Sequence, residues 1–396
     1  MGRRMARALA LAVVATLCAC VRLSDSANER AFEVSAAWVG GRPVVAWYGG
    51  KLGHEAIYLR RADMQGRWQG PAVRLTDASK DAFEPSLQDI DGDALVAWYE
   101  QEQAPTAVSP RQFVQVGRFD LSGRRIWQRR LSGEDVRGRI PVVRVAGNVV
   151  HVAWLEQRGD EPPMLRSAKL DAMGGWLSPP RDLFPAGRAT WNLNAAIGPD
   201  GSLHVVFDTE AGRAKELEWI AAGAAHIARF ASVDDGQTSM FPDIAIGGGR
   251  FAITWVDSRD GNDEVYLRCG KLGPEGLPVA QQAIDATGAQ RVTHTAGAST
   301  GAYAAWNGSG FELAWVESRG PRGLVMHQAF DADCRPRAKA SPVDGWGSAG
   351  IPSLASSPAG LLLAWNGMRG DPASATSRVL LKIWPTPGVS RSAAAR

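Results

Sequence analysis

The sequence predicts an all-β fold, a seven-bladed β-propeller of four-stranded antiparallel blades, with six blades as the alternative. The first observation is an apolar, strand-like segment that ends in an aromatic residue and recurs every 48 to 60 residues. The second is the absence of helical 3.6-residue periodicity after the N-terminal segment. The seven recurring aromatic residues are Trp47, Trp98, Trp154, Phe207, Trp255, Trp315 and Trp365. Six blades would result if the divergent fourth repeat, with Phe207, formed none.

Each repeat contains the signals of four short strands. Pro85, Pro141, Pro242 and Pro352 each lie 13 residues before their Trp, and we expect each Pro to be the first residue of a strand, where its missing N–H breaks little pairing. The Trp strand follows, then a third strand. An Asp-x-x-Gly turn and a fourth strand close the unit. A Trp between stacked sheets would fill the space between blades, which explains why 15 Trp outnumber 11 Phe and 5 Tyr.

The last repeat has strands at 352–356, 361–365 and 378–384 but no fourth strand. We expect Arg30 to Glu33 to supply that strand and close the ring from the N-terminus. The predicted boundaries are a signal peptide at 1–19, a linker with this ring-closing strand at 20–33, the propeller at 34–385 and a disordered tail at 386–396.

The N-terminal segment has the pattern of an export signal. Arg3, Arg4 and Arg7 precede a short apolar run at 8–17, which is too short to span a bilayer. The following Leu17-Cys18-Ala19-Cys20 resembles the lipobox of bacterial lipoproteins. That resemblance implies lipidation of Cys20 and a membrane partner reached through the lipid anchor. It also implies a location in the cell envelope, facing the periplasm, at the outer membrane because Val21 is not Asp. The alternative is an ordinary secretory signal.

The charge balance and the cysteine and histidine content indicate which partners, bonds and cofactors to expect. Loss of residues 1–19 would leave 41 basic and 41 acidic residues, so we expect no nucleic-acid partner, since phosphate binding needs a clustered positive surface. Cys269 and Cys334 fall in neighbouring repeats and could form a disulfide after export. They could equally remain two small apolar residues. We expect no cofactor and no metal, because the six His have no paired-ligand spacing.

The loops after the Trp strands carry an acid and an Arg in several repeats. They should open on one face of the propeller, as a ring around a central funnel, where Arg binds carboxylates or phosphates. The acids are Glu100, Glu156, Asp257 and Glu317, and the arginines are Arg158, Arg259, Arg319 and Arg369. Alternatively, each acid caps its own turn and pairs with an Arg, which would tie the blades together. Aromatic residues before the first strands, among them Trp191, Phe241 and Trp346, should lie on the same face and suit a sugar or peptide.

The repeat pattern over residues 34–385 resembles the sialidase-like, Asp-box class of propellers. Residues 232–239 look like one Asp-box, and Arg139-Ile140-Pro141 resembles the segment that carries a substrate-binding arginine in true sialidases. The resemblance implies Arg139 as a ligand-binding residue. It departs from the family because Arg139 lies in the third repeat rather than the first, and no Tyr is identifiable as a nucleophile.

The sequence therefore favours a non-enzymatic binding module at the cell envelope, with a protein or carbohydrate ligand at the funnel face. The alternative is a glycosidase or sialidase-like hydrolase, which would use funnel arginines and a carboxylate pair among Glu100, Glu156, Asp257 and Glu317.

Overall fold

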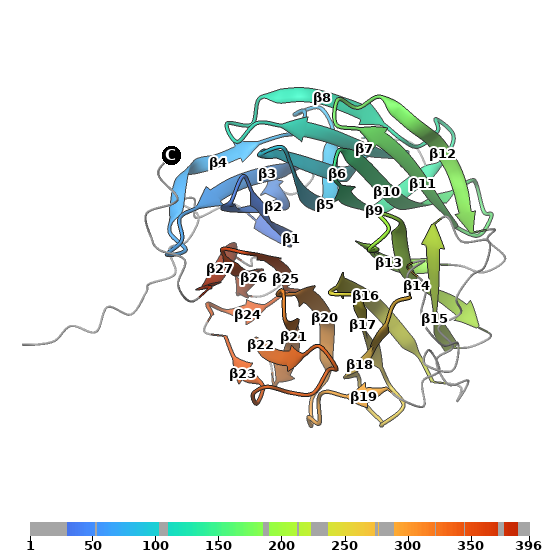
Figure 1. Ribbon diagram of the computed structural model, residues 1–396. Helices are drawn as coiled ribbons and strands as arrows, with labels where there is room; N and C mark the ends of the chain where they lie inside the picture. Colours follow the sequence, from blue (N-terminus) through green and yellow to red (C-terminus); the bar gives the residue numbers. More distant parts are fainter. Residues whose placement is uncertain are drawn as a thin grey trace, which may run out of the picture.

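The chain forms a ring of antiparallel β-meanders (Figure 1). The computed structural model describes residues 30–51, 54–102, 110–184, 190–211, 214–222, 237–273, 276, 289–320, 322–343, 345–370 and 376–386. Within these ranges every regular element is a strand, so the all-β propeller class is confirmed. No segment of the described ranges is a helix of the length and apolarity needed to cross a membrane. Residues 1–19 with Cys20, and nearly all of 386–396, lie outside the described residues.

The strands follow one another as short up-and-down units. The first three units are β1 (Arg30–Val39), β2 (Arg42–Lys51), β3 (His54–Ala62) and β4 (Trp68–Arg74); β5 (Asp81–Ile90), β6 (Asp93–Gln101), β7 (Gln112–Phe119) and β8 (Arg125–Arg130); and β9 (Arg137–Ala146), β10 (Val149–Gln157), β11 (Met164–Asp171) and β12 (Trp176–Phe184). The next is β13 (Thr190–Ile197), β14 (Leu203–Ala211) and β15 (Ala214–Ala222).

The remaining units are β16 (Ser239–Gly247), β17 (Arg250–Asp257), β18 (Glu264–Lys271) and β19 (Gln290–Arg291); β20 (Ser299–Trp306), β21 (Gly310–Arg319), β22 (Arg322–Asp331) and β23 (Ser341–Pro342); and β24 (Ser348–Ala349), β25 (Ser353–Ser357), β26 (Gly360–Arg369) and β27 (Thr376–Pro385). Strands β24 and β25 both pair with β26, so they are two parts of one interrupted inner strand. One parallel bridge between Gln112 and Arg137 joins the second and third units into an eight-stranded sheet.

The aromatic residue of each second strand lies between two neighbouring units. Trp98 packs against residues of the first unit, such as Val39 and Leu59, and Trp154 packs against the second. The same holds for Phe207, Trp255, Trp315 and Trp365. These six side chains are at most 1% exposed. The predicted role of the repeated Trp as a filler between blades is confirmed, and it accounts for much of the Trp content.

The ring closes through side chains rather than through a shared sheet. Arg30 to Glu33 do not form the fourth strand of the last unit, and that prediction is wrong. Arg30, Ala31 and Phe32 pair with β2, because β2 is joined to β1 by a two-residue turn and closing such a short loop costs little entropy. Trp47 then packs against Leu362 and Leu381 of the last unit. The Ser377 hydroxyl donates a hydrogen bond to the Ala31 carbonyl.

The prolines do not begin their strands as expected. Pro85, Pro141 and Pro242 lie inside β5, β9 and β16, at a shift in register with the second strand. A bulge leaves residues of one strand unpaired, so the missing Pro N–H breaks no ladder bond there. Pro352 lies in the interruption between β24 and β25.

Two further local predictions can be compared with the structure. In the Asp-x-x-Gly turns, Gly66, Gly123 and Gly174 have positive φ and donate their N–H to the Asp carbonyl three residues earlier. Cys269 of β18 and Cys334, in the turn after β22, form a disulfide with a Cα–Cα distance of 6.1 Å. The bond links the fifth unit to the sixth. Residues 232–236 of the predicted Asp-box lie outside the described residues.

Candidate functional site

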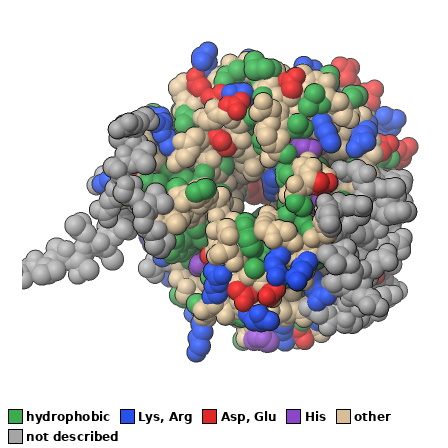
Figure 2. Space-filling view, in the orientation of Figure 1, with side chains coloured by type: hydrophobic (Ala, Val, Ile, Leu, Met, Phe, Trp, Pro, Cys, Tyr) green, Lys and Arg blue, Asp and Glu red, His purple; other side chains and the backbone are tan. Residues whose placement is uncertain are grey.

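The inner strands enclose a cavity of about 840 Å³ at the centre of the ring. Its described walls come from β1, β5, β9, β13, β16, β20 and β25. Figure 2 shows this face of the molecule hollowed at its centre. A concave site to which every unit of the ring contributes is the usual place for a ligand.

Bulges aim a set of side chains at the mouth of this cavity. The residue 14 positions before the Trp has a left-handed backbone in four units, and it is not glycine: Glu33 (φ 39°), Glu84 (φ 53°), Ile140 (φ 51°) and Phe241 (φ 53°). All four line the cavity. A left-handed conformation costs a residue with a Cβ roughly 1–2 kcal/mol, and such strain is concentrated at functional sites.

Two of these four residues are neighbouring carboxylates. Glu33 faces the cavity and Glu84 is half-buried. Enclosure by the cavity walls raises the pKa of Glu33 to about 6. Burial, together with the charge of Glu33, raises the pKa of Glu84 to about 8, against the N–H of Ile140 and the charge of Arg139. At neutral pH, Glu84 is therefore protonated and Glu33 mostly ionised, which is the division of roles between an acid and its partner.

A row of aromatic rings lies beside the carboxylates. The Tyr48 ring is 5.5 Å from the Phe32 ring and 5.3 Å from the Phe83 ring, and Phe83 stacks on Tyr99 at 5.1 Å. Burial, followed by the negative charges of Glu33 and Glu84, raises the pKa of both Tyr48 and Tyr99. Both phenols are thus neutral at physiological pH, so they suit hydrogen bonding rather than attack as phenolates.

Arg139, which the sequence predicts as a ligand-binding residue, lies close enough to Glu84 for its charge to act on it. Its charge lowers the pKa of Glu84 relative to burial alone. Its guanidinium also lies over the Trp191 ring at 5.6 Å, and the Lys215 ammonium lies over the same ring at 5.4 Å. Trp191 is 40% exposed, and its indole Nε1 donates to Glu210 Oε1 at 3.1 Å.

The Asp208 carboxylate joins the backbones of two aromatic residues, Trp191 and Phe241. Asp208 is fully buried, and its carboxylate accepts hydrogen bonds from the backbone N–H of Trp191 at 3.2 Å and from that of Phe241 at 3.2 Å. The Asn192 N–H and side-chain amide donate to the same carboxylate. Phe241 and Ile351 are 37% and 38% exposed. The mouth therefore has an acidic side at β1 and β5 and an apolar side at β13, β16 and β24–β25.

The predicted acids of the post-Trp loops lie away from the cavity. Each is buried, and three accept the indole N–H of the Trp two residues earlier: Trp98 to Glu100, Trp154 to Glu156 and Trp255 to Asp257, at 3.0 to 3.2 Å. Glu156 also pairs with Arg166 and Glu100 with Lys80. None is among the described residues that line the cavity. This geometry agrees with one part of the alternative, in which each acid is bonded near its own turn. It does not support the other part, that these acids tie neighbouring blades together, because their indole partners lie in the same unit.

The predicted arginines behave similarly. Arg259 Nε donates to Asp257 at 2.8 Å, and Arg319 Nε donates to Glu317 at 2.8 Å. Arg369 lies over the Trp346 ring at 4.5 Å, and Arg158 is exposed in the loop after β10. Of the predicted set, Phe241 lines the cavity. Arg139 lies over the Trp191 ring, and Trp191 shares the Asp208 carboxylate with Phe241. The other predicted residues lie at their own blades.

Sequence reasoning missed Glu33, Glu84 and Asp208 as a group. A signal was present, because the position 14 residues before each Trp contains the two acids in the first two repeats. The described residues contain no group of three or more His, Cys, Asp and Glu side chains arranged to hold a metal.

The comparisons with known proteins concern the fold. No family model matches the chain, and no curated protein matches it. Among solved structures, a prolyl endopeptidase is 15% identical over 90% of this chain and 49% of its own, with a TM-score of 0.51. An α-L-arabinanase of Penicillium chrysogenum is 11% identical over 92% of this chain and 97% of its own, with a TM-score of 0.49.

A subtype N10 neuraminidase-like protein of A/little yellow-shouldered bat/Guatemala is 6% identical over 93% of this chain and 97% of its own, with a TM-score of 0.45. Glycoside hydrolases and a neuraminidase-like protein are thus among the solved structures that this chain is similar to. At these identities the similarity extends to the fold, and chemistry has to be argued from the site.

Proposed function

We propose that the chain is a glycoside hydrolase whose acid is Glu84 and whose second carboxylate is Glu33. The observation that carries this proposal is the pair itself: two neighbouring carboxyl groups, held by strained backbone at the mouth of the central cavity, with pKa values of about 8 and about 6. Glycosidic bonds are cleaved by such a pair, one carboxyl protonated and the other ionised. The carboxylates named from the sequence are replaced in this role, because they are bonded inside their blades.

The chemistry follows from the charges. Glu84 gives its proton to the glycosidic oxygen as the bond from that oxygen to the anomeric carbon breaks. As that bond breaks, Glu33 takes one of two roles. In the first it bonds to the anomeric carbon, and a water that gives its proton to the now ionised Glu84 then displaces Glu33. In the second Glu33 takes a proton from a water that bonds to the anomeric carbon directly. Retained or inverted configuration in the product distinguishes these two routes. Tyr48 and Tyr99 supply neutral hydroxyl donors nearby, and the partly exposed ring of Phe241 suits the C–H face of a sugar.

Turnover of chromogenic glycosides by the purified chain tests the proposal. We expect p-nitrophenol release from at least one glycoside in a panel, and a loss of roughly 10²- to 10⁴-fold in kcat for Glu84→Gln and for Glu33→Gln. Asp91→Asn is the matched control, because Asp91 is exposed in the hairpin turn at the other end of β5. Equal turnover by Glu84→Gln and the parent protein would contradict the assignment, as would no turnover of any glycoside.

The second candidate is the non-enzymatic binding of a glycan or a protein at the same mouth. One observation favours it: Glu84 Oε2 accepts the Ile140 N–H, so this carboxyl also ties β5 to β9. A structural carboxyl would persist without any chemistry. Binding on a glycan array, with no turnover of the bound glycans, would support this candidate over hydrolysis.

We also propose that the protein is exported and anchored in the cell envelope through a lipid on Cys20, at the outer membrane. The support is the segment Leu17 to Cys20 after the short apolar run. Labelling of cells with a palmitate analogue should mark the parent protein and leave Cys20→Ala unmarked. Label that persists in Cys20→Ala would contradict the anchor.

A further inference from the structure

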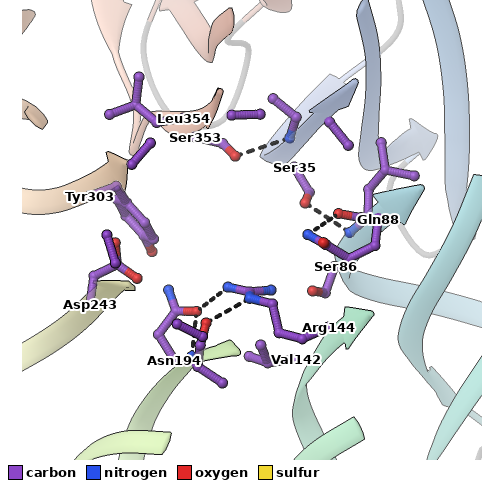
Figure 3. Close-up of a pocket in the computed structure, with 18 of the residues that line it drawn as sticks. Ser35, Ser86, Gln88, Val142, Arg144, Asn194, Asp243, Tyr303, Ser353 and Leu354 are labelled. Carbon is purple, nitrogen blue, oxygen red and sulfur yellow. Dashed lines mark hydrogen bonds between the residues drawn. The ribbon is translucent and has the colours of Figure 1, made fainter. Parts of the chain in front are cut away.

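The wall below the mouth has two chemically different halves (Figure 3). On one half, three serines hold neighbouring blades together. Ser353 Oγ accepts the Ala36 N–H at 3.0 Å, Ser35 Oγ accepts the Leu87 N–H at 2.9 Å, and Ser86 Oγ accepts the Val143 N–H at 3.1 Å. Each bond joins the inner strands of two adjacent units. This half therefore uses its side-chain acceptors to fix the ring.

The other half keeps hydrogen-bonding capacity for a ligand. Arg144 donates from Nε to the Ala195 carbonyl at 2.6 Å, from Nη1 to the Val143 carbonyl at 2.8 Å, and from Nη2 to Asn194 at 2.7 Å. A guanidinium has five N–H groups, so two remain. Figure 3 shows Arg144, Asp243 and Tyr303 around the same cavity.

Asp243 and Tyr303 have similar spare capacity. Asp243 is 4% exposed, and its carboxylate accepts the Ala304 N–H at 2.7 Å through Oδ2 and also the Ile244 N–H. A carboxylate has about four acceptor positions, so about two remain. Among the described residues, none forms a hydrogen bond with the Tyr303 hydroxyl, and this hydroxyl is not closed off from the cavity. Arg144 and Tyr303 as donors and Asp243 as an acceptor thus line one cavity with part of their hydrogen-bonding capacity unused.

The charges at this level are balanced. Of the described residues that line the cavity, Arg144 is the only Lys or Arg. Asp243 lies close enough for the two charges to act on each other. Asp89, further along β5, bonds the Gly40 N–H at 2.8 Å. An anionic ligand would meet the carboxylates of Glu33 and Asp243, and a cationic one would meet Arg144. Sugar hydroxyls both donate and accept, so an uncharged sugar matches this wall.

The group lies deeper in the cavity than the mouth. Asp243 lies two residues beyond Phe241 on the inner strand, as Ser35 and Ser86 lie two residues beyond Glu33 and Glu84. Arg144 lies four residues beyond Ile140, so it comes from still further along its strand. We propose that Arg144, Asp243 and Tyr303 form a binding subsite for one uncharged sugar ring, below the bond that Glu33 and Glu84 would cleave. This inference rests on the carbohydrate part of the proposed function.

The experiment measures binding separately from turnover. Isothermal titration calorimetry on the Glu84→Gln chain uses neutral p-nitrophenyl glycosides (arabinofuranoside, galactopyranoside, xylopyranoside and mannopyranoside), the anionic glucuronide and sialic acid, and tri-lysine. We expect at least one neutral glycoside to bind at least tenfold more tightly than the charged probes. Adding Tyr303→Phe should weaken that binding about two- to tenfold, and Asp243→Asn about tenfold or more.

Ser353→Ala is the matched control, since its hydroxyl is already bonded to Ala36. It should lower the melting temperature and leave the affinity within twofold. The subsite is refuted if no neutral glycoside binds, if glucuronide, sialic acid or tri-lysine binds more tightly, or if Tyr303→Phe and Asp243→Asn bind like their parent. Neutral glycosides could bind through Asp243 and Tyr303 and yet not be hydrolysed by the parent protein, which retains Glu84. That result would contradict the proposed hydrolase and would still support the subsite.

Discussion

The backbone N–H of Ile140 donates a hydrogen bond to Glu84 Oε2 at 3.0 Å, from the bulge of one inner strand to the carboxyl on the bulge of the strand before it. The bond orients the carboxyl and opposes the effect of its burial on the pKa. Two neighbouring blades thus determine the position and the protonation of one side chain. If Glu84 acts as an acid, the dependence of the rate on pH should report this arrangement.

Hydrolysis should have a bell-shaped pH dependence. We expect kcat/KM to fall below about pH 6, as Glu33 takes up a proton, and above about pH 8, as Glu84 loses one. Initial rates on a chromogenic glycoside between pH 4 and 10 measure both limbs. Because the charge of Arg139 lowers the pKa of Glu84, Arg139→Gln should move the alkaline limb to higher pH. A rate that is flat across both limbs would contradict the assigned roles.

The raised pKa of Glu84 should also reduce stability at alkaline pH. Folding raises this pKa from 4.5 to about 8, so the folded chain binds more protons than the unfolded chain between these values. The free energy of unfolding therefore falls as pH rises through that range. Glu84→Gln carries no charge and escapes this loss. The melting temperature of Glu84→Gln minus that of the parent protein should be larger at pH 9 than at pH 5. The same difference at both pH values would refute the raised pKa of Glu84.

The hydrogen bonds between indoles and buried acids should be measurable as stability. Trp154 donates to Glu156 at 3.2 Å, whereas the Trp315 N–H has no hydrogen-bond partner within the described residues. Both side chains are at most 1% exposed, so the change to Phe removes similar buried volume. Urea denaturation followed by circular dichroism should show that Trp154→Phe costs about 1–2 kcal/mol more than Trp315→Phe. Equal losses of unfolding free energy in the two variants would mean that the hydrogen bond from the indole to Glu156 does not stabilise the fold.

The disulfide should stabilise the contact between the fifth and sixth units. Cys269 and Cys334 are 65 residues apart, and loss of a native disulfide typically costs about 2–5 kcal/mol. We expect reductant to lower the denaturation midpoint of the parent protein to that of the Cys269→Ser, Cys334→Ser double variant. The double variant itself should not respond to reductant. An unchanged denaturation midpoint of the parent protein in reductant would exclude a stabilising disulfide.

The repeat was predictable because burial of a large ring at a fixed place in each blade is a local property of the sequence. Trp98 and Trp154 mark their strands regardless of what the distant chain does. The bulges were not predictable in the same way. Pro141 indicated a strand start, but the structure uses it to leave residues of β9 unpaired.

The site was less predictable because it depends on ring closure. Glu33 and Glu84 are 51 residues apart in sequence, and only the packing of successive inner strands makes them neighbours. Asp208 directly follows Phe207 in β14, whereas Glu156 lies two residues beyond Trp154 in β10. Asp208 accepts the backbone N–H groups of Trp191 and Phe241, and Glu156 accepts an indole N–H. The residue type was visible from the sequence, and its partners were not.

Packing of Trp47 against Leu362 and Leu381 has a consequence for biogenesis. The ribosome makes Trp47 more than 300 residues before these partners. One face of the first unit therefore stays exposed to solvent until synthesis is nearly finished. A prematurely terminated chain would present that indole and the edge beside it to proteases. Burial of Trp47 therefore requires the last unit of the ring.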